Sequence, residues 1–109
     1  NRELMLEKYR EDNNPKLPSR LHSIWLADKK SLNFWEGQLN GSGKLKLYRV
    51  SITGNLFKSS DSFIPDDELT TKEMYEVSSI YWNPVFRKDD LEKAEYLFQG
   101  KVKVLEKIK

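Results

Sequence analysis

Few residues of this 109-residue chain have types and positions that could do chemistry, and Glu95 is the clearest of them. It lies in the apolar run 94–98, which is typical of a strand and follows a short helix over 89–93. Asp89 and Asp90 can cap that helix. A carboxylate at the beginning of a strand, at a sheet edge, could supply a fixed negative charge to a reaction. A solvated glutamate on an edge strand is the alternative interpretation.

A second group of candidates surrounds Arg20, between Ser19 and Ser23. The planar guanidinium of Arg20 offers five donors in a geometry that suits phosphate. Arg10 could join it, and an ion pair with a surface carboxylate is the alternative role. His22 is the only histidine; it could carry a proton near neutral pH, but its apolar neighbours favour a structural role.

Four aromatic residues could stack on a nicotinamide, an adenine or an unpaired base. We expect Trp25 and Trp35 to pack in the core. Tyr81 and Trp82 lie at the end of a helix, next to a proline, so we expect them to be exposed.

The composition excludes several classes of site. The chain has no cysteine, which rules out disulfides and thiolate catalysis. With no cysteine and one histidine, whose apolar neighbours favour a structural role, neither a catalytic triad nor a metal site is expected. The net charge is only +2, so nothing demands a nucleic-acid partner. No apolar run approaches the roughly 20 residues that span a bilayer, and a reducing cytoplasm is compatible with the composition.

The hydrophobic pattern predicts one α+β domain over residues 1–109, in which a small mixed or antiparallel sheet is flanked by three to four helices. Residues 20–26 are apolar on both faces, which indicates an inner strand. A capping box, Thr70 with Glu73, begins one helix, and Asn83-Pro84 ends it. The remaining predicted elements are helices over 2–12 and 29–39, a loop over 40–43, strands over 44–53 and 102–108, and turns at 54–55 and 99–100.

The closing stretch, AEYLFQGKVKVLEKI, resembles the end of the ADP-ribosyltransferase-like fold, and SSIYWNP resembles the helix that borders the cleft in that family. The likeness covers about residues 17–108. The chain is similar in particular to small bacterial and phage domains related to DNA-modifying ADP-ribosyltransferase toxins. The resemblance implies transfer of ADP-ribose from NAD to a nucleic acid or a protein. It also implies that Glu95 contacts the nicotinamide ribose.

The resemblance further implies that Ser19, Arg20 and Ser23 lie near ribose or phosphate and that Tyr81 or Trp82 forms a stacking wall. One departure matters. The first strand of that family should precede the helix over 2–12, and no apolar strand stands there. We therefore expect that strand to lie upstream of Asn1, unless the chain is a shortened relative that does not bind NAD.

Two other functions stay open. A noncatalytic module that binds a protein partner would leave Glu95 pointing to solvent, with an apolar patch at Trp82, Pro84, Val85 and Phe86. Binding of single-stranded nucleic acid would use the aromatic residues and lysines, but the near-neutral net charge argues against it.

Overall fold

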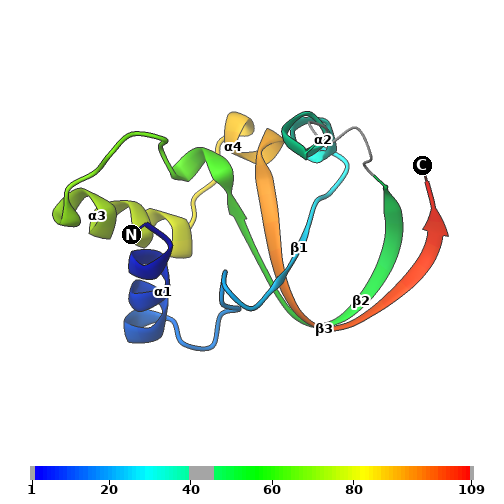
Figure 1. The fold of residues 1–109 in the computed structure, drawn as a ribbon, viewed down its shortest axis with the longest axis horizontal. Helices are drawn as coiled ribbons and strands as arrows, with labels where there is room; N and C mark the ends of the chain where they lie inside the picture. Colours follow the sequence, from blue (N-terminus) through cyan, green and yellow to red (C-terminus); the bar gives the residue numbers. More distant parts are fainter. Residues whose placement is uncertain (1, 40–45, 109) are drawn as a thin grey trace.

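A computed structural model describes residues 2–39 and 46–108. Within them lie four α-helices, one 3-10 helix and three strands, which confirms the predicted α+β class (Figure 1). In chain order they are α1 (Arg2–Asn13), β1 (Ile24–Leu26), α2 (Leu32–Leu39), β2 (Tyr48–Ser60), η2 (Asp61–Phe63), α3 (Thr71–Trp82), α4 (Lys88–Glu92) and β3 (Ala94–Lys107). None of the helices in this described part is long and apolar enough to cross a membrane.

The sheet is antiparallel, with the strand order β1-β3-β2. β3 and β2 pair along their whole lengths, from Tyr48 opposite Lys107 to Ser60 opposite Ala94. We call this pair the β-ribbon, and it curves strongly along its length (Figure 1). β1 pairs only with Tyr96–Phe98 at the other edge of β3. The prediction of an inner strand over 20–26 was therefore wrong, because β1 is an edge strand and residues 20–22 turn and bend before the pairing begins.

The two predicted turns at 54–55 and 99–100 are also wrong, because both lie inside the β-ribbon. Gly54 pairs with Gly100, and their φ angles are 152° and 153°. A Cβ at Gly54 would lie 2.4 Å from the carbonyl oxygen of Gln99. These glycines therefore allow close approach of two strands rather than reversal of the chain. The predicted loop over 40–43 and the first residues of the predicted strand over 44–53 lie outside the described residues.

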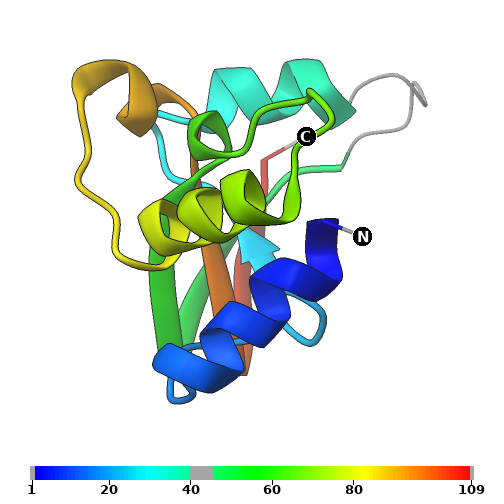
Figure 2. The ribbon, with the colours of Figure 1, turned by 90° about the vertical axis from the view of Figure 1, so that its left-hand side faces the viewer.

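The helices α1 and α3 pack against each other and cover one face of the sheet (Figure 2). The capping box of Thr70 and Glu73 is present at the start of α3, as predicted. Of the two aspartates predicted to cap α4, Asp90 does so by accepting a hydrogen bond from the backbone N–H of Arg87. The core between helices and sheet consists of Leu6, Met74, Tyr81, Trp82 and Leu97.

Three of the four aromatic residues, Tyr81, Trp82 and Trp25, lie in environments opposite to those predicted from the sequence. Tyr81 and Trp82 are fully buried, and the indole N–H of Trp82 donates to the carbonyl of Leu6 at 2.9 Å. Trp25 is 43% exposed, whereas Trp35 is half-buried and donates to the carbonyl of Ala94 at 2.7 Å. The predicted exposure of Tyr81 and Trp82 and the predicted burial of Trp25 were wrong, because α3 lies directly on the sheet while β1 is an edge strand.

Candidate functional site

Glu95 is the second residue of β3 and is only 2% exposed. It lies opposite Ser59 of β2, so it belongs to the central strand and not to an edge. The interpretation of Glu95 as a solvated glutamate is therefore wrong. Since a buried carboxylate needs partners, its contacts decide what it can do.

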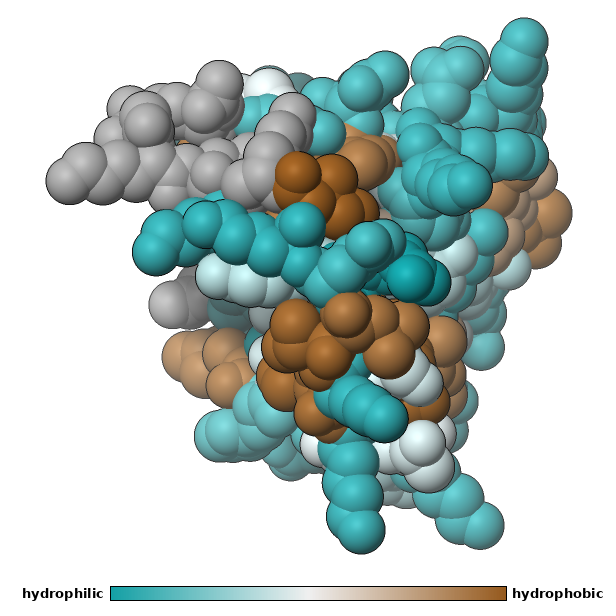
Figure 3. Space-filling model, turned by 90° about the vertical axis from the view of Figure 1, so that its right-hand side faces the viewer, coloured by the Kyte–Doolittle hydropathy of each residue, from teal (hydrophilic) through white to brown (hydrophobic). Residues whose placement is uncertain are grey.

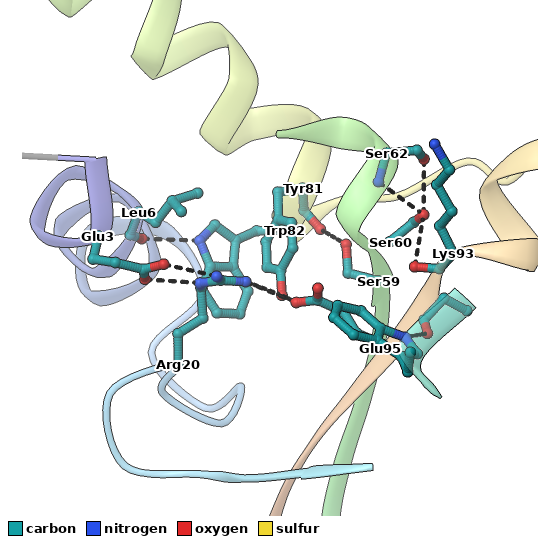
Figure 4. Close-up of polar contacts among 12 residues, drawn as sticks. Glu3, Leu6, Arg20, Ser59, Ser60, Ser62, Tyr81, Trp82, Lys93 and Glu95 are labelled. Carbon is teal, nitrogen blue, oxygen red and sulfur yellow. Dashed lines mark hydrogen bonds and ion pairs between the residues drawn. The ribbon is translucent and has the colours of Figure 1, made fainter. Parts of the chain in front are cut away.

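Arg20 and Tyr81 hold one oxygen of Glu95. Arg20 donates through Nη1 to Glu95 Oε2 and to the Tyr81 hydroxyl, both at 2.7 Å, and the Tyr81 hydroxyl donates to the same carboxylate oxygen (Figure 4). The outer side of the guanidinium binds Glu3, with Nε and Nη2 donating to its two oxygens at 2.8 and 2.7 Å. We call these four residues the Arg20 cluster.

Two aromatic rings flank the guanidinium. Its central carbon lies 4.6 Å from the ring centroid of Trp25 and 4.9 Å from that of Tyr81. Stacking of this kind favours the charged planar group. Arg20 is therefore fixed both by hydrogen bonds in its plane and by rings against its faces.

The electrostatics of the Arg20 cluster follow from burial. Burial raises the pKa of Glu95, even though the charge of Arg20 works in the opposite direction. Burial and the charge of Glu95 raise the pKa of Tyr81, so its hydroxyl stays a neutral donor. Burial disfavours the charged form of Arg20, but the hydrogen bonds to Glu3 and the charges of Tyr81, Glu95 and Glu3 together outweigh it and raise the pKa of Arg20. The cluster therefore holds a permanent cation next to a carboxylate whose proton affinity is increased.

The two oxygens of Glu95 differ in their contacts. Oε2 accepts both hydrogen bonds, and within residues 2–39 and 46–108 no hydrogen bond reaches Oε1 (Figure 4). Ser59, opposite Glu95, uses its hydroxyl to donate to the backbone carbonyl of Tyr81 at 2.7 Å. The carboxylate is thus oriented through one oxygen while the other is able to accept a hydrogen bond from a ligand.

The structure places the other predicted site residues in different surroundings. Ser19 donates to Glu7, which also pairs with Arg10 at 2.6 Å, so Ser19 and Arg10 form a neighbouring network and do not contact Glu95. The hydroxyl of Ser23 is buried without a hydrogen-bond partner in the described part of the chain. Of the predicted residues, only Arg20 and Tyr81 therefore contact Glu95.

Sequence reasoning missed Glu3. Glu3 and Glu7 are four residues apart on α1, so they share one face of the helix. Like charges at this spacing destabilise a helix unless each has a partner, and here Arg20 and Arg10 are those partners. This spacing was the signal that could have found both residues.

A metal centre has no support in the described residues, where no group of three or more His, Cys, Asp or Glu side chains is placed to hold an ion. The side chain of His22 is exposed and does not join the Arg20 cluster.

Residues 1–109 match the family model described as "Protein of unknown function (DUF2441)". The chain belongs to the DUF2441 family. A comparison with curated proteins gives no match. Because this family carries no assigned activity, the function of the DUF2441 chain has to be argued from its geometry.

The DUF2441 domain also has an apolar face on its β-ribbon. Val50 lies opposite Val104, and Ile52 opposite Val102, so these four side chains share one face of the sheet. Val102 and Val104 are 39% and 59% exposed, and Tyr48 at the end of β2 is 45% exposed. Figure 3 shows apolar side chains, surrounded by polar ones, on the side of the molecule where the β-ribbon ends.

Proposed function

We propose that this DUF2441 chain is an ADP-ribosyltransferase-like domain that takes NAD as substrate and transfers its ADP-ribose to a protein or a nucleic acid. The observation that carries the proposal is the carboxylate of Glu95, which Arg20 and Tyr81 hold through Oε2 while Oε1 has no partner among the described residues.

The chemistry suits such a carboxylate. When the bond between nicotinamide and the ribose C1 breaks, nicotinamide leaves with the bonding electrons and positive charge develops on the ribose. A fixed carboxylate stabilises this charge, and its unpaired oxygen can accept a hydrogen bond from a ribose hydroxyl. A nucleophile of the acceptor then bonds to C1. Glu95 is the residue that would supply the negative charge, and Arg20 and Tyr81 would position it.

A ligand that approaches Glu95 from the side of Glu3 meets Arg20 first. The side chain of Arg20 is 9% exposed and that of Glu95 only 3%, whereas Glu3 on the outside is 42% exposed. The carboxylate of Glu3 binds two donors of the guanidinium side by side, which is also how a phosphate group is bound. We therefore propose that a phosphate of NAD replaces Glu3 on Arg20, with the exposed ring of Trp25 beside it.

Calorimetric titration of the chain with NAD tests the proposal. We expect Glu95→Gln to weaken binding and Glu3→Gln to strengthen it, because the amide competes less with phosphate for Arg20. Glu106→Gln is the matched control, since Glu106 forms an exposed ion pair with Arg49 on the β-ribbon. NAD affinities that are equal in wild type, Glu95→Gln and Glu3→Gln would refute the proposal.

The second candidate is a noncatalytic module that binds a protein partner. The observation that favours it is the apolar face of the β-ribbon, since large exposed apolar patches mark interaction sites. Of the patch expected at Trp82, Pro84, Val85 and Phe86, Trp82 is buried while Val85 is 83% exposed, and Glu95 does not point to solvent. Sedimentation of the wild type and of Val104→Lys separates the two functions. A concentration-dependent complex that the substitution abolishes, without NAD binding, would favour the module.

A further inference from the structure

A second feature lies between α2 and α4, at the end of the sheet where β3 begins (Figure 1). Two hollows of about 320 and 280 Å³ share Lys30 and Glu92 in their walls and therefore adjoin. We call them together the lysine groove. Its wall residues include Lys30, Asn33, Phe34, Lys88, Glu92 and Lys93.

The walls of the lysine groove carry more positive than negative charge, although Lys93 also interacts with the charge of Asp61. The groove holds three lysines against one carboxylate, and no ion pair reaches Lys30, Lys88 or Lys93 in the described residues. Each ammonium group offers three hydrogen-bond donors. Such a groove attracts anions with more than one negative charge, and phosphate esters are of this kind.

An aromatic wall and polar groups add selectivity to the charge. The ammonium nitrogen of Lys93 lies 5.5 Å from the ring centroid of Phe34, which is half-buried in the wall. Asn33 and Glu92 supply an amide and a carboxylate beside this ring. An inorganic phosphate would contact only the lysines. A nucleoside phosphate would in addition contact the ring of Phe34 with its base and the polar groups of Asn33 and Glu92 with its hydroxyls and base edge.

We infer that the lysine groove binds a nucleoside phosphate, with the phosphate at the lysines and the ring against Phe34. A hollow of about 320 Å³ has the size of small-ligand sites, which begin at about 300 Å³.

The groove is separate from the Arg20 cluster. α2 contacts the start of β3 through Trp35, which donates to the carbonyl of Ala94. None of the four residues of the Arg20 cluster is among the wall residues of either hollow. The inference therefore does not depend on the proposed transferase function.

NMR titration of the full chain with AMP, adenosine and inorganic phosphate tests the inference. The indole N–H signal of Trp35 is the reporter, because its ring lies 4.9 Å from that of Phe34. AMP should bind about tenfold more tightly than adenosine or phosphate, which corresponds to about 1.4 kcal/mol for each added part. Its affinity should fall as salt rises from 50 to 300 mM, since exposed charges are screened.

Matched variants locate the site. The double variant K30Q/K93Q should weaken AMP about tenfold, and Phe34→Leu should weaken AMP but not phosphate. The control K101Q/K103Q removes the same charge from the β-ribbon and should change the affinity less than twofold. The inference is overturned if wild type does not bind millimolar AMP, if phosphate binds as tightly as AMP, or if the control loses as much affinity as K30Q/K93Q.

Discussion

The substitution Arg20→Met tests whether the Arg20 cluster is a true buried charge network. Methionine keeps much of the apolar stem beside Trp25 and Tyr81 but removes the donors that Arg20 supplies to Glu95 and Glu3, while Tyr81 still donates to Glu95. The side chain of Glu95 is 3% exposed, so little water can reach it to replace the lost partner. Removing one member of a buried pair costs about 3–5 kcal/mol. We expect a loss of this size, out of a total stability of about 5–15 kcal/mol.

Arg49→Met is the matched control. Arg49 pairs with Glu106 at 2.7 Å, the same distance as between Arg20 and Glu95. The two side chains are 59% and 55% exposed, however, and exposed pairs contribute about 0.2–1 kcal/mol. The two substitutions remove the same type of group at the same distance, so the difference in the loss reports burial together with the additional hydrogen bonds of Arg20 to Glu3 and Tyr81.

Urea unfolding followed by tryptophan fluorescence gives the free energies, provided that the slope with denaturant stays constant. The double variant R20M/E95Q should recover part of the loss, because it leaves no charge buried at Glu95. The loss in Arg20→Met should also shrink at pH 5, where Glu95 takes up a proton more readily. A loss in Arg20→Met no larger than in Arg49→Met would refute the reasoning.

Three further predictions concern pH, the β-ribbon and a helix cap. Burial raises the pKa of Glu95 above its ordinary value of 4.5, so its stabilising contribution is present below that value and is lost as pH rises through the raised pKa. The stability of wild type minus that of Glu95→Gln should therefore fall in urea titrations as pH rises above 4.5, and a rise would mean that the neighbouring guanidinium keeps the carboxylate ionised. Gly100→Ala should lower the unfolding free energy by about 1–3 kcal/mol, because φ is 153° and the new Cβ would meet a carbonyl oxygen at 2.4 Å; Gly37→Ala, a helical position with nothing within 4 Å, should raise it by about 0.5–1 kcal/mol. If calorimetry shows equal effects, strand approach does not require Gly100. Thr70→Ala should cost about 1 kcal/mol by removing the hydrogen bond to the N–H of Glu73, and unchanged urea unfolding would contradict the role of that cap.

The sequence predicted those parts of the fold that depend on neighbouring residues. The α3 helix begins at a capping box whose two members are three residues apart, and the structure contains that box at Thr70 and Glu73. Local signals failed where partners are distant. Gly54 and Gly100 look like turn residues in isolation, but each is opposite the other in the β-ribbon. A glycine in a strand and a glycine in a turn differ only in what lies across from them.

The candidate site shows the same division. Arg20, Tyr81 and Glu95 were selected by residue type and element, and the structure brings them into contact across separations of up to 75 residues. Their burial was not predicted, because β1 was expected to be an inner strand and Tyr81 to lie at an exposed helix end. The burial arises because α3 packs on the sheet directly above Glu95.

The residues opposite the start of β3 explain why a carboxylate is tolerated in this position. Ser59 and Ser60 pair with Glu95 and Ala94, and both serines are fully buried. Ser59 faces α3, and its small side chain leaves room for the helix to approach while its hydroxyl donates to the carbonyl of Tyr81. This bond holds the end of α3 where the Tyr81 hydroxyl reaches Glu95. Ser60 points the other way and donates to the carbonyl of Asp90 on α4. Ser59 is thus a neutral residue of β2 that helps to position Glu95.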